Sequence, residues 1–148
     1  MAYEQLKLEN QLCFRLYTAS RLITQAYEPF FKPLGITYTQ YIVLMVLWEK
    51  DEQPINDIGK RLKLGINTTS PLIKRMESQG LLARRGSDTD KRQQIVFLTR
   101  KGKELEKEAS KIPSCMLDLL CTSKLDVSSI ASGMIPLLDE LICKLSEK

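Results

Sequence analysis

The chain has 148 residues, of which 43% are hydrophobic, and it carries a net charge of +4. This length is enough for one compact domain with its own core, and the composition excludes a disordered chain. The absence of histidine excludes Cys–His and Ser–His nucleophiles and removes the commonest metal ligand, so we expect no enzyme, no cofactor and no metal site. Four scattered cysteines, with neither an export signal nor a membrane-spanning run, predict a cytoplasmic protein without a membrane partner.

Two helices are predicted in the first third of the chain. Apolar residues recur every three or four positions from Leu8 to Phe30, which is typical of one long helix, and Pro29 marks its end. A second helix passes through the stretch 42–48, which is apolar almost all round and should lie in the centre of the fold. Residues 51–54 then form a turn.

A helix-turn-helix pattern follows this turn. Apolar residues predict a short helix over 55–62, Gly65 breaks it, and a polar run at 67–70 opens a second short helix. Pro71 falls in the first turn of that second helix, where a missing N–H costs least, and Gly80 is expected to end it.

Two strand candidates come next, Leu81–Arg85 and Gln94–Leu98, joined by the turn-rich segment 86–92. They predict a hairpin with a basic tip. From Lys74 to Lys103 there are nine Lys and Arg residues against three acids, so this segment carries +6 and the remainder −2. Such a concentration of positive charge is typical of a nucleic-acid surface, although a solvated charged face is a frequent alternative.

Helices are predicted again after the hairpin. Thr99 caps a charged helix that runs from Lys101 past Pro113, and a last helix covers 127–145. The outer helices carry more apolar surface than one small domain can cover, and pairing with a second copy would bury it. We expect a mainly α protein with a small β-hairpin wing (α+β), a winged helix-turn-helix that forms an intertwined homodimer. The expected organisation is a single domain over 1–148, with dimerisation helices at 8–32 and 101–146 and a DNA-binding core at 38–99.

The helix-turn-helix and the basic hairpin together suggest how duplex DNA would be held. The second short helix would enter the major groove and the hairpin tip an adjacent minor groove. Lys74 and Arg75 can neutralise phosphates, and Arg92 can enter the minor groove while Asp90 holds its guanidinium. For each of these side chains an ordinary solvated surface position is the alternative. The short polar side chains at the helix start that suit base edges and phosphates are Asn67, Thr68, Thr69 and Ser70.

Five segments of the chain form a recognisable set: Gln11–Tyr17, Ile36–Tyr41, Ser70–Leu81, Asp88–Arg92 and Leu98–Thr99. Together they resemble the MarR family of transcription regulators and, within it, the organic-hydroperoxide-resistance regulators. The similarity covers about residues 8–125. It implies a homodimer that binds an inverted-repeat operator and usually represses a neighbouring gene. The start of the second short helix departs from the family's usual sequence, so the resemblance does not imply a particular operator.

Cys13 lies on the apolar stripe of the first predicted helix, where a buried structural cysteine is the alternative to a reactive one. A reactive cysteine needs nearby donors or positive charge that stabilise its thiolate. Tyr17 lies one helical turn away, and Tyr27 and Tyr38 are further phenols that can donate. The resemblance implies that Cys13 is the redox-sensing residue and that these three tyrosines stabilise its thiolate. It also implies that the pocket lies at the dimer interface, with tyrosines approaching from the partner subunit.

The resemblance further implies a resolving cysteine, which in some relatives lies in the helix after the wing of the other subunit. Cys121 fits that place best and Cys115 is the second candidate, while Cys143 is expected to pack in the last helix. A sulfenic acid on Cys13 can instead condense with a low-molecular-weight thiol. The alternative is that the later cysteines are core or incidental thiols.

The function that we expect is that of a homodimeric repressor, which binds double-stranded DNA at an inverted repeat when reduced. Organic hydroperoxide would oxidise Cys13 and so release the operator. One alternative is a regulator of the same fold that responds to a small aromatic or phenolic ligand at the dimer cleft. A less favoured one is a thiol peroxidase, against which the missing histidine and the basic wing argue. Zinc binding through the four cysteines lacks the Cys-x-x-Cys pair that is typical of such sites.

Overall fold

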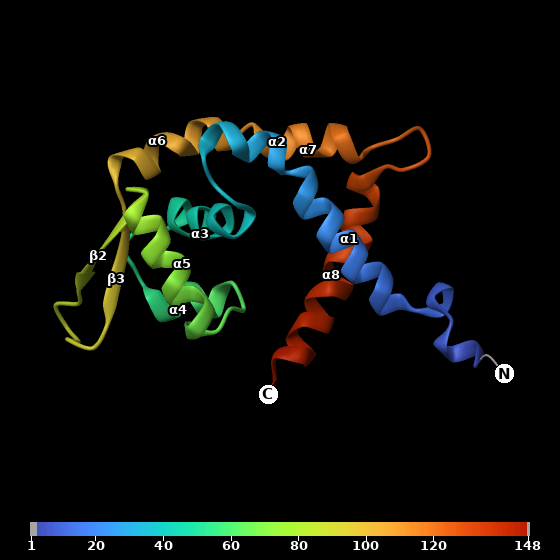
Figure 1. The fold of residues 1–148 in the computed structure, drawn as a ribbon, viewed down its shortest axis with the longest axis horizontal. Helices are drawn as coiled ribbons and strands as arrows, with labels where there is room; N and C mark the ends of the chain where they lie inside the picture. The colour runs from blue at the N-terminus through green and yellow to red at the C-terminus, as the bar shows by residue number, and fades with distance from the viewer. Residues whose placement is uncertain (1–2, 148) are drawn as a thin grey trace. The chain divides into compact units, whose positions relative to one another are not determined.

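Figure 1 shows the computed structural model, in which residues 3–147 are described. The chain divides into two compact units with the boundary between Tyr38 and Thr39. The second unit is mainly helical and carries a small antiparallel sheet, which confirms the predicted fold class. The assignment of 8–32 and 101–146 to dimerisation and of 38–99 to DNA binding stays a prediction.

The first unit contains one long helix and several short helical segments rather than the single helix that we predicted over 8–30. Gln11 is extended, so the first long helix begins only at Leu12. Pro29 has no N–H to donate to the carbonyl of Gln25, and α1 ends in a tighter turn in which the Tyr27 N–H donates to Thr24 O at 3.3 Å. The elements are η1 (Glu4–Leu6), η2 (Leu8–Asn10), α1 (Leu12–Ala26), α2 (Glu28–Phe31) and η3 (Lys32–Leu34).

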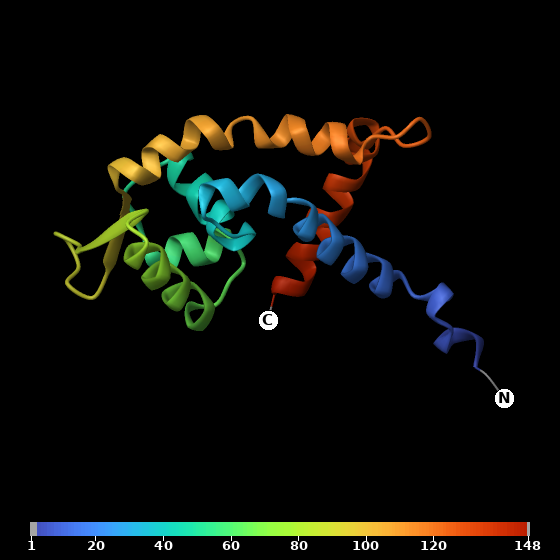
Figure 2. The ribbon, with the colours of Figure 1, turned by 45° about the horizontal axis from the view of Figure 1, so that its top comes forward.

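The second unit follows the predicted order of elements, with one addition. Its helices are α3 (Tyr38–Glu49, whose first residue belongs to the first unit), α4 (Ile55–Arg61), α5 (Ile66–Ser78), α6 (Arg100–Ala109), α7 (Ile112–Leu120) and α8 (Val127–Ser146). Its strands are β1 (Gln53–Pro54), β2 (Leu82–Gly86) and β3 (Gln94–Leu98). Figure 2 shows the hairpin of β2 and β3 extending away from the helices at one end of this unit.

Helix α3 supplies much of the core, as its nearly uniform apolar sequence predicted. Val43 and Leu44 are fully buried, the side chain of Gln40 donates a hydrogen bond to the residue that directly follows α5, and the side chain of Trp48 donates one to α6. The Gln40 Nε2–Gln79 Oε1 distance is 2.8 Å and the Trp48 Nε1–Gly102 O distance is 3.0 Å. Helix α3 is thus bonded to the elements that precede and follow the hairpin.

The sheet has three strands in the order β1-β3-β2, all antiparallel. We predicted a turn at 51–54, but Gln53 and Pro54 pair with β3 as the short strand β1. Two residues are too few to show an alternating pattern in the sequence. Pro54 is compatible with this place because β1 is an edge strand, where a missing N–H need not join a ladder.

The first turn of helix α6 packs against the turn that follows α5. As predicted, Thr99 caps the helix, since its Oγ1 accepts from the Gly102 N–H at 3.2 Å. The same hydroxyl donates to Gly80 O at 2.6 Å. A Cβ atom at Gly102 would lie 2.1 Å from the carbonyl oxygen of Leu81. Only glycine therefore allows α6 to pack this closely against the turn.

Helices α7 and α8 complete the chain. The charged helix was expected to continue past Pro113, but α6 ends at Ala109 and α7 begins at Ile112, because Pro113 has no N–H to donate to the Ala109 carbonyl. Helix α8 starts at the cap residue Asp126, whose carboxylate accepts from the Ser128 N–H at 3.1 Å. Among the described residues no single helix is long and apolar enough to span a membrane; the bent pair Leu12–Leu34 with Tyr38–Glu49 reaches that length and character only when taken together.

Gly102→Ala should destabilise the second unit. The added methyl group meets the Leu81 carbonyl, and overpacking of this kind costs about 1–3 kcal/mol, which outweighs the ~1 kcal/mol that alanine gains in helix propensity. The measurement is the free energy of unfolding in urea. The matched control is Gly86→Ala, since a Cβ at Gly86 meets nothing within 4 Å and should leave stability almost unchanged. Equal stability of the two variants would contradict the packing described for α6.

Candidate nucleic-acid interface and thiol site

Helices α4 and α5 form the predicted helix-turn-helix. Gly59 lies at their contact, where a Cβ would come within 3.0 Å of the Leu64 carbonyl and of the Thr69 hydroxyl. The turn uses Lys63 in the left-handed conformation (φ 56°) and then the extended Gly65, which precedes the first residue of α5. The close contact of the two helices and the bend between them agree with the pattern read from the sequence.

Helix α5 begins at Ile66, earlier than we predicted. The N–H groups of Thr68 and Thr69 already donate to Gly65 O at 3.0 and 2.9 Å. Pro71 therefore lies inside the helix rather than in its first turn, which corrects the prediction. Pro71 is exposed, so water can reach the carbonyl that loses its helical donor. The helix ends at Ser78, and Gly80 (φ 73°) turns the chain away two residues later, as expected from its freedom to adopt a left-handed conformation.

The four polar residues predicted to read DNA do not all face outward. Asn67 and Thr68 are exposed and Ser70 is partly exposed. Thr69 is fully buried, and its hydroxyl donates to Gly65 O at 3.0 Å. The assignment of Thr69 to DNA contact was therefore wrong, because this side chain packs at the junction of α4 and α5.

The nine cations of the basic segment 74–103 fall into two groups. Five are held by other parts of the chain: four in ion pairs with carboxylates, and Lys101 by donating to the Gln79 carbonyl at 3.0 Å. The other four have no ion pair or side-chain hydrogen bond within residues 3–147 and are exposed. These are Lys74 and Arg75 on α5 and Lys91 and Arg92 at the hairpin tip. The cations left for a polyanion thus lie on the helix and the wing predicted to hold DNA.

Asp90 supports the hairpin tip differently from our expectation. Its Oδ1 accepts from the backbone N–H of Arg92 at 2.9 Å, and its carbonyl accepts from the Gln93 N–H at 3.0 Å. No ion pair joins the Asp90 and Arg92 side chains in the described part of the chain. The carboxylate fixes the backbone of the turn, which is the usual role of an aspartate in such a position, and leaves the guanidinium free in solvent.

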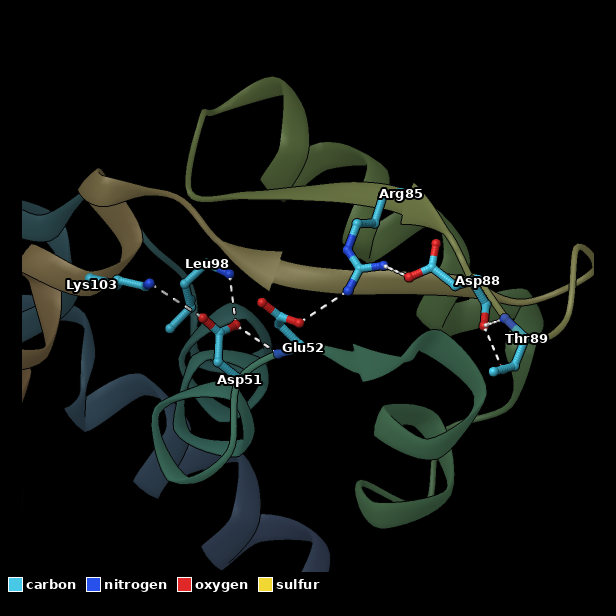
Figure 3. A network of polar contacts seen from close by, with 8 residues as sticks. Asp51, Glu52, Arg85, Asp88, Thr89, Leu98 and Lys103 are labelled. Atoms are coloured by element: carbon cyan, nitrogen blue, oxygen red, sulfur yellow. Dashed lines mark hydrogen bonds and ion pairs between the residues drawn. The ribbon is translucent and has the colours of Figure 1, made fainter.

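Sequence reasoning missed two adjacent acids in the turn between α3 and β1, shown in Figure 3. The carboxylate of Asp51 accepts from the N–H groups of Leu98 and Glu52, both at 2.9 Å, and lies 3.6 Å from Lys103 Nζ. The carboxylate of Glu52 lies 3.0 Å from Arg85 on β2. These contacts join the end of α3 to the sheet, the wing and α6. No local pattern reveals them, since their partners on the sheet, the wing and α6 lie 33 to 52 residues further along the chain.

The thiol of Cys13 is exposed on α1, which does not support the alternative of a structural cysteine buried in the core of its own chain. Tyr17, one turn further along α1, is 67% exposed. Tyr27 and Tyr38 lie together, with their ring centroids 5.1 Å apart, and Phe31 stacks on Tyr27 at the same distance. Burial raises the pKa of Tyr27 above its ordinary value, and Tyr38 raises it further. The Tyr27 phenol therefore stays protonated at neutral pH and keeps its O–H donor.

The four residues predicted for the thiol site form two separate groups in one chain. Tyr17 shares α1 with Cys13, but Tyr27 follows Cys13 by 14 positions. At a rise of 1.5 Å per helical residue the two are about 20 Å apart. The thiol and the Tyr27–Tyr38 pair can meet only if the pair comes from a second copy.

The other three cysteines are also exposed free thiols. Cys115 lies in α7, Cys121 directly follows α7, and Cys143 lies in α8, where it is exposed rather than packed as we predicted. Across residues 3–147 no group of three or more Cys, Asp or Glu side chains is arranged to hold a metal ion.

Comparisons with known proteins place the chain in a family. Residues 25–109, more than half of the chain, match the family model "Transcriptional regulator SarA/Rot". The chain is 40% identical over 139 residues to the organic hydroperoxide resistance transcriptional regulator of Bacillus subtilis, which covers 94% of this chain and 95% of that protein. The chain belongs to the MarR family. This finding confirms the resemblance seen in the sequence.

Solved structures of AbfR, a protein known from Staphylococcus epidermidis, also resemble this MarR-family chain. Reduced AbfR bound to DNA is 36% identical, with a TM-score of 0.80 over 99% of this chain and 100% of that one. Overoxidized AbfR bound to DNA is 38% identical, with a TM-score of 0.77 over the same shares. AbfR with a disulfide formed is 39% identical, with a TM-score of 0.66 over 98% and 96%. The MarR-family winged-helix fold is thus established.

The different positions of Thr68 and Thr69 give a test of the α4–α5 junction. Thr69→Val removes the buried hydroxyl that donates to Gly65 O and should lower the free energy of unfolding by about 1 kcal/mol. Thr68→Val changes an exposed side chain and should leave stability within about 0.5 kcal/mol. Urea unfolding measures both. A neutral Thr69→Val would mean that the hydroxyl is solvated and not buried.

Proposed function

We propose that this protein is a homodimeric cytoplasmic repressor, which binds an inverted repeat in double-stranded DNA when reduced and releases it when organic hydroperoxide oxidises Cys13. The observation that carries the proposal is the exposed thiol of Cys13 on a helix with no buried residue. The 40% identity to the Bacillus subtilis regulator supports organic hydroperoxide as the oxidant. Relatives that are transcriptional regulators favour this function over an enzymatic one.

The apolar surfaces of α1 and α8 support the dimer. Neither helix has a single buried residue, although α1 has 15 residues and α8 has 20. Burial of each large apolar side chain contributes about 1.5–3 kcal/mol, so a second copy that covers these faces would be held strongly. The large apolar residues exposed on α1 and α8 are Leu12, Phe14, Tyr17, Leu22, Ile23, Ile130, Met134, Ile135, Leu137, Leu141, Ile142 and Leu145. The same pairing would bring Tyr27 and Tyr38 of the partner subunit to Cys13.

The unpaired cations support a specific mode of DNA binding. Helix α5 would enter the major groove, where Asn67, Thr68 and Ser70 meet base edges and phosphates. Lys74 and Arg75 would neutralise phosphates. In this mode Arg92 reaches an adjacent minor groove from the hairpin tip. Asp90 holds the backbone of the turn, and the exposed Lys91 adds positive charge beside Arg92. The two-fold symmetry of the dimer calls for an inverted repeat.

The chemistry at Cys13 consists of two steps. The thiolate attacks the terminal oxygen of the hydroperoxide and the O–O bond breaks, so that Cys13 becomes a sulfenic acid. The alkoxide leaves and takes up a proton from solvent to become the alcohol. A second thiol then attacks the sulfenic sulfur, so that a disulfide forms and water is released. The phenols of Tyr17, Tyr27 and Tyr38 would stabilise the thiolate by donating hydrogen bonds to it.

The second thiol decides when DNA is released. AbfR is known bound to DNA both reduced and overoxidized, and it is also known with a disulfide formed. We therefore assign release in this protein to the disulfide and not to oxidation of Cys13 alone. Cys121 is the preferred resolving residue, with Cys115 second, and a low-molecular-weight thiol can take the same role. Losing two contacts of about 1–3 kcal/mol each weakens binding roughly 30-fold or more.

A pocket in the first unit favours a second candidate function. It has a volume of about 710 Å³ and is lined by residues that include Thr24, Phe31, Ile36 and Tyr38. A cavity of this size can hold a small aromatic or phenolic ligand. A regulator that responds to such a ligand would release DNA without oxidation of Cys13.

Substitution of Cys13 separates the two functions. The assay is fluorescence anisotropy with a duplex selected from a random library by the reduced protein. Cumene hydroperoxide should weaken binding of the unmodified protein about 30-fold or more, while Cys13→Ser should keep its affinity. Cys143→Ser is the matched control and should respond like the unmodified protein. Release of Cys13→Ser by peroxide would refute thiol sensing, and release by a phenolic ligand would favour the second function.

Arg92→Ala tests the wing contact. Loss of one cation per subunit should weaken binding across sequences and reduce the slope of log K against log salt by about 0.9 for each arginine removed. Arg100→Ala is the control, since Arg100 is similarly exposed but is paired with Glu104 on α6. An unchanged slope for Arg92→Ala would show that the hairpin tip does not contact phosphates or the minor groove.

A further inference from the structure

Two consecutive arginines attach the base of the wing to the rest of the second unit. Successive side chains of a strand point to opposite faces of the sheet, and Arg84 and Arg85 follow this rule on β2. Arg84 turns toward α5, where its Nη2 lies 2.7 Å from the carboxylate of Glu77. Arg85 turns to the other face, where its Nη2 lies 3.0 Å from the carboxylate of Glu52. The hairpin is therefore held on both faces.

The pair of Arg85 and Glu52 spans the sheet. Ile95 on the central strand β3 pairs with Arg85 on one side and with Pro54 on the other. Neighbouring strands lie about 4.8 Å apart, so the two outer strands are separated by roughly 10 Å. Figure 3 shows the Arg85 side chain reaching from β2 to Glu52, two residues before Pro54. This contact connects the two edges of the sheet in addition to the backbone hydrogen bonds.

The local backbone directs Glu52 toward this contact. Glu52 adopts the left-handed conformation (φ 56°), which is uncommon for a residue with a side chain. The Asp51 carboxylate accepts the Glu52 N–H and the Leu98 N–H, so it holds this turn against the end of β3. On the wing side, Arg85 also lies 3.8 Å from Asp88 in the hairpin tip. A continuous set of charges thus leads from the end of α3 to the tip.

We propose that Glu52 is a positioning residue for the wing. Its ion pair with Arg85 sets the angle between the hairpin tip and the rest of the sheet, and this angle determines where Arg92 meets DNA. The inference rests on the proposed function, because it requires Arg92 to contact DNA. It differs from a masking role, in which Glu52 would only keep the Arg85 cation away from phosphates.

A double-mutant cycle between Glu52→Gln and Arg92→Ala tests the proposal. Binding is measured by anisotropy with the same selected duplex at several salt concentrations. An exposed ion pair of this kind has a modest effect, so Glu52→Gln should weaken binding by no more than about fivefold. In the Arg92→Ala background Glu52→Gln should change affinity less than about twofold, because the side chain whose contact with DNA depends on the wing angle is then missing. Glu104→Gln is the matched control: it removes one charge from another exposed Glu–Arg pair and should have no effect.

Each outcome has one meaning. An equal loss from Glu52→Gln in both backgrounds would overturn the proposal, since Glu52 would then act elsewhere than through the tip. Tighter binding with a steeper salt dependence would also overturn it, in favour of masking. If Arg92→Ala itself binds like the unmodified protein, the wing contact in the proposed function is at fault. If Arg92→Ala weakens binding and Glu52→Gln does not, only the positioning role fails.

Discussion

The winged-helix unit depends on the burial of one face of α5. Leu72, Ile73 and Met76 are almost completely enclosed, and Thr69 uses its hydroxyl inside the same packed layer. Because this face is fixed to the core, the opposite face cannot turn away from solvent. The polar and basic residues at the helix start and one turn later are therefore presented in a rigid array. A helix held in this way can insert into a groove without losing much conformational freedom of its own.

Electrostatic interactions within the unit distinguish cations that hold the fold from cations that remain free. The basic residues at the base of the wing and at the start of α6 are engaged by carboxylates or by a carbonyl. Those on α5 and at the hairpin tip have no such partner within residues 3–147. A count of charge along the chain cannot make this distinction, although it located the segment correctly. In space the unpaired cations form two groups, one on α5 and one at the hairpin tip.

The sequence predicted the elements that have long periodic patterns or strong end signals. The apolar helix α3, the two hairpin strands, the cap at Thr99 and the stop at Gly80 all belong to this class. The wrong predictions concern element boundaries and short strands, which depend on single backbone donors or on tertiary contacts. The break near Tyr27 depends on one missing donor, and β1 is too short for any periodicity.

In the candidate site, too, some features follow from the local sequence and others depend on tertiary contacts. The basic residues of α5 and the wing follow from local charge, whereas the exposure of Cys13 does not follow from its place on the apolar stripe of α1, which is equally compatible with burial. The burial of Thr69 could not be predicted, because it depends on how closely Gly59 lets α4 approach. Asp51 and Glu52 look like ordinary turn residues in the sequence. Their importance comes from partners brought together by the sheet, which one sequence without its fold does not reveal.

The hydrogen bond between Trp48 and Gly102 has an optical consequence. Trp48 is the chain's single tryptophan, so all indole emission comes from one partly buried place on α3 in the second unit. Its donor contacts the first turn of α6, which directly follows the last strand of the wing. A strained or displaced α6 would break this bond and change the polarity around the ring. The protein thus contains an intrinsic fluorophore at the joint between its central helix and its wing, and no label is needed to follow that joint in solution.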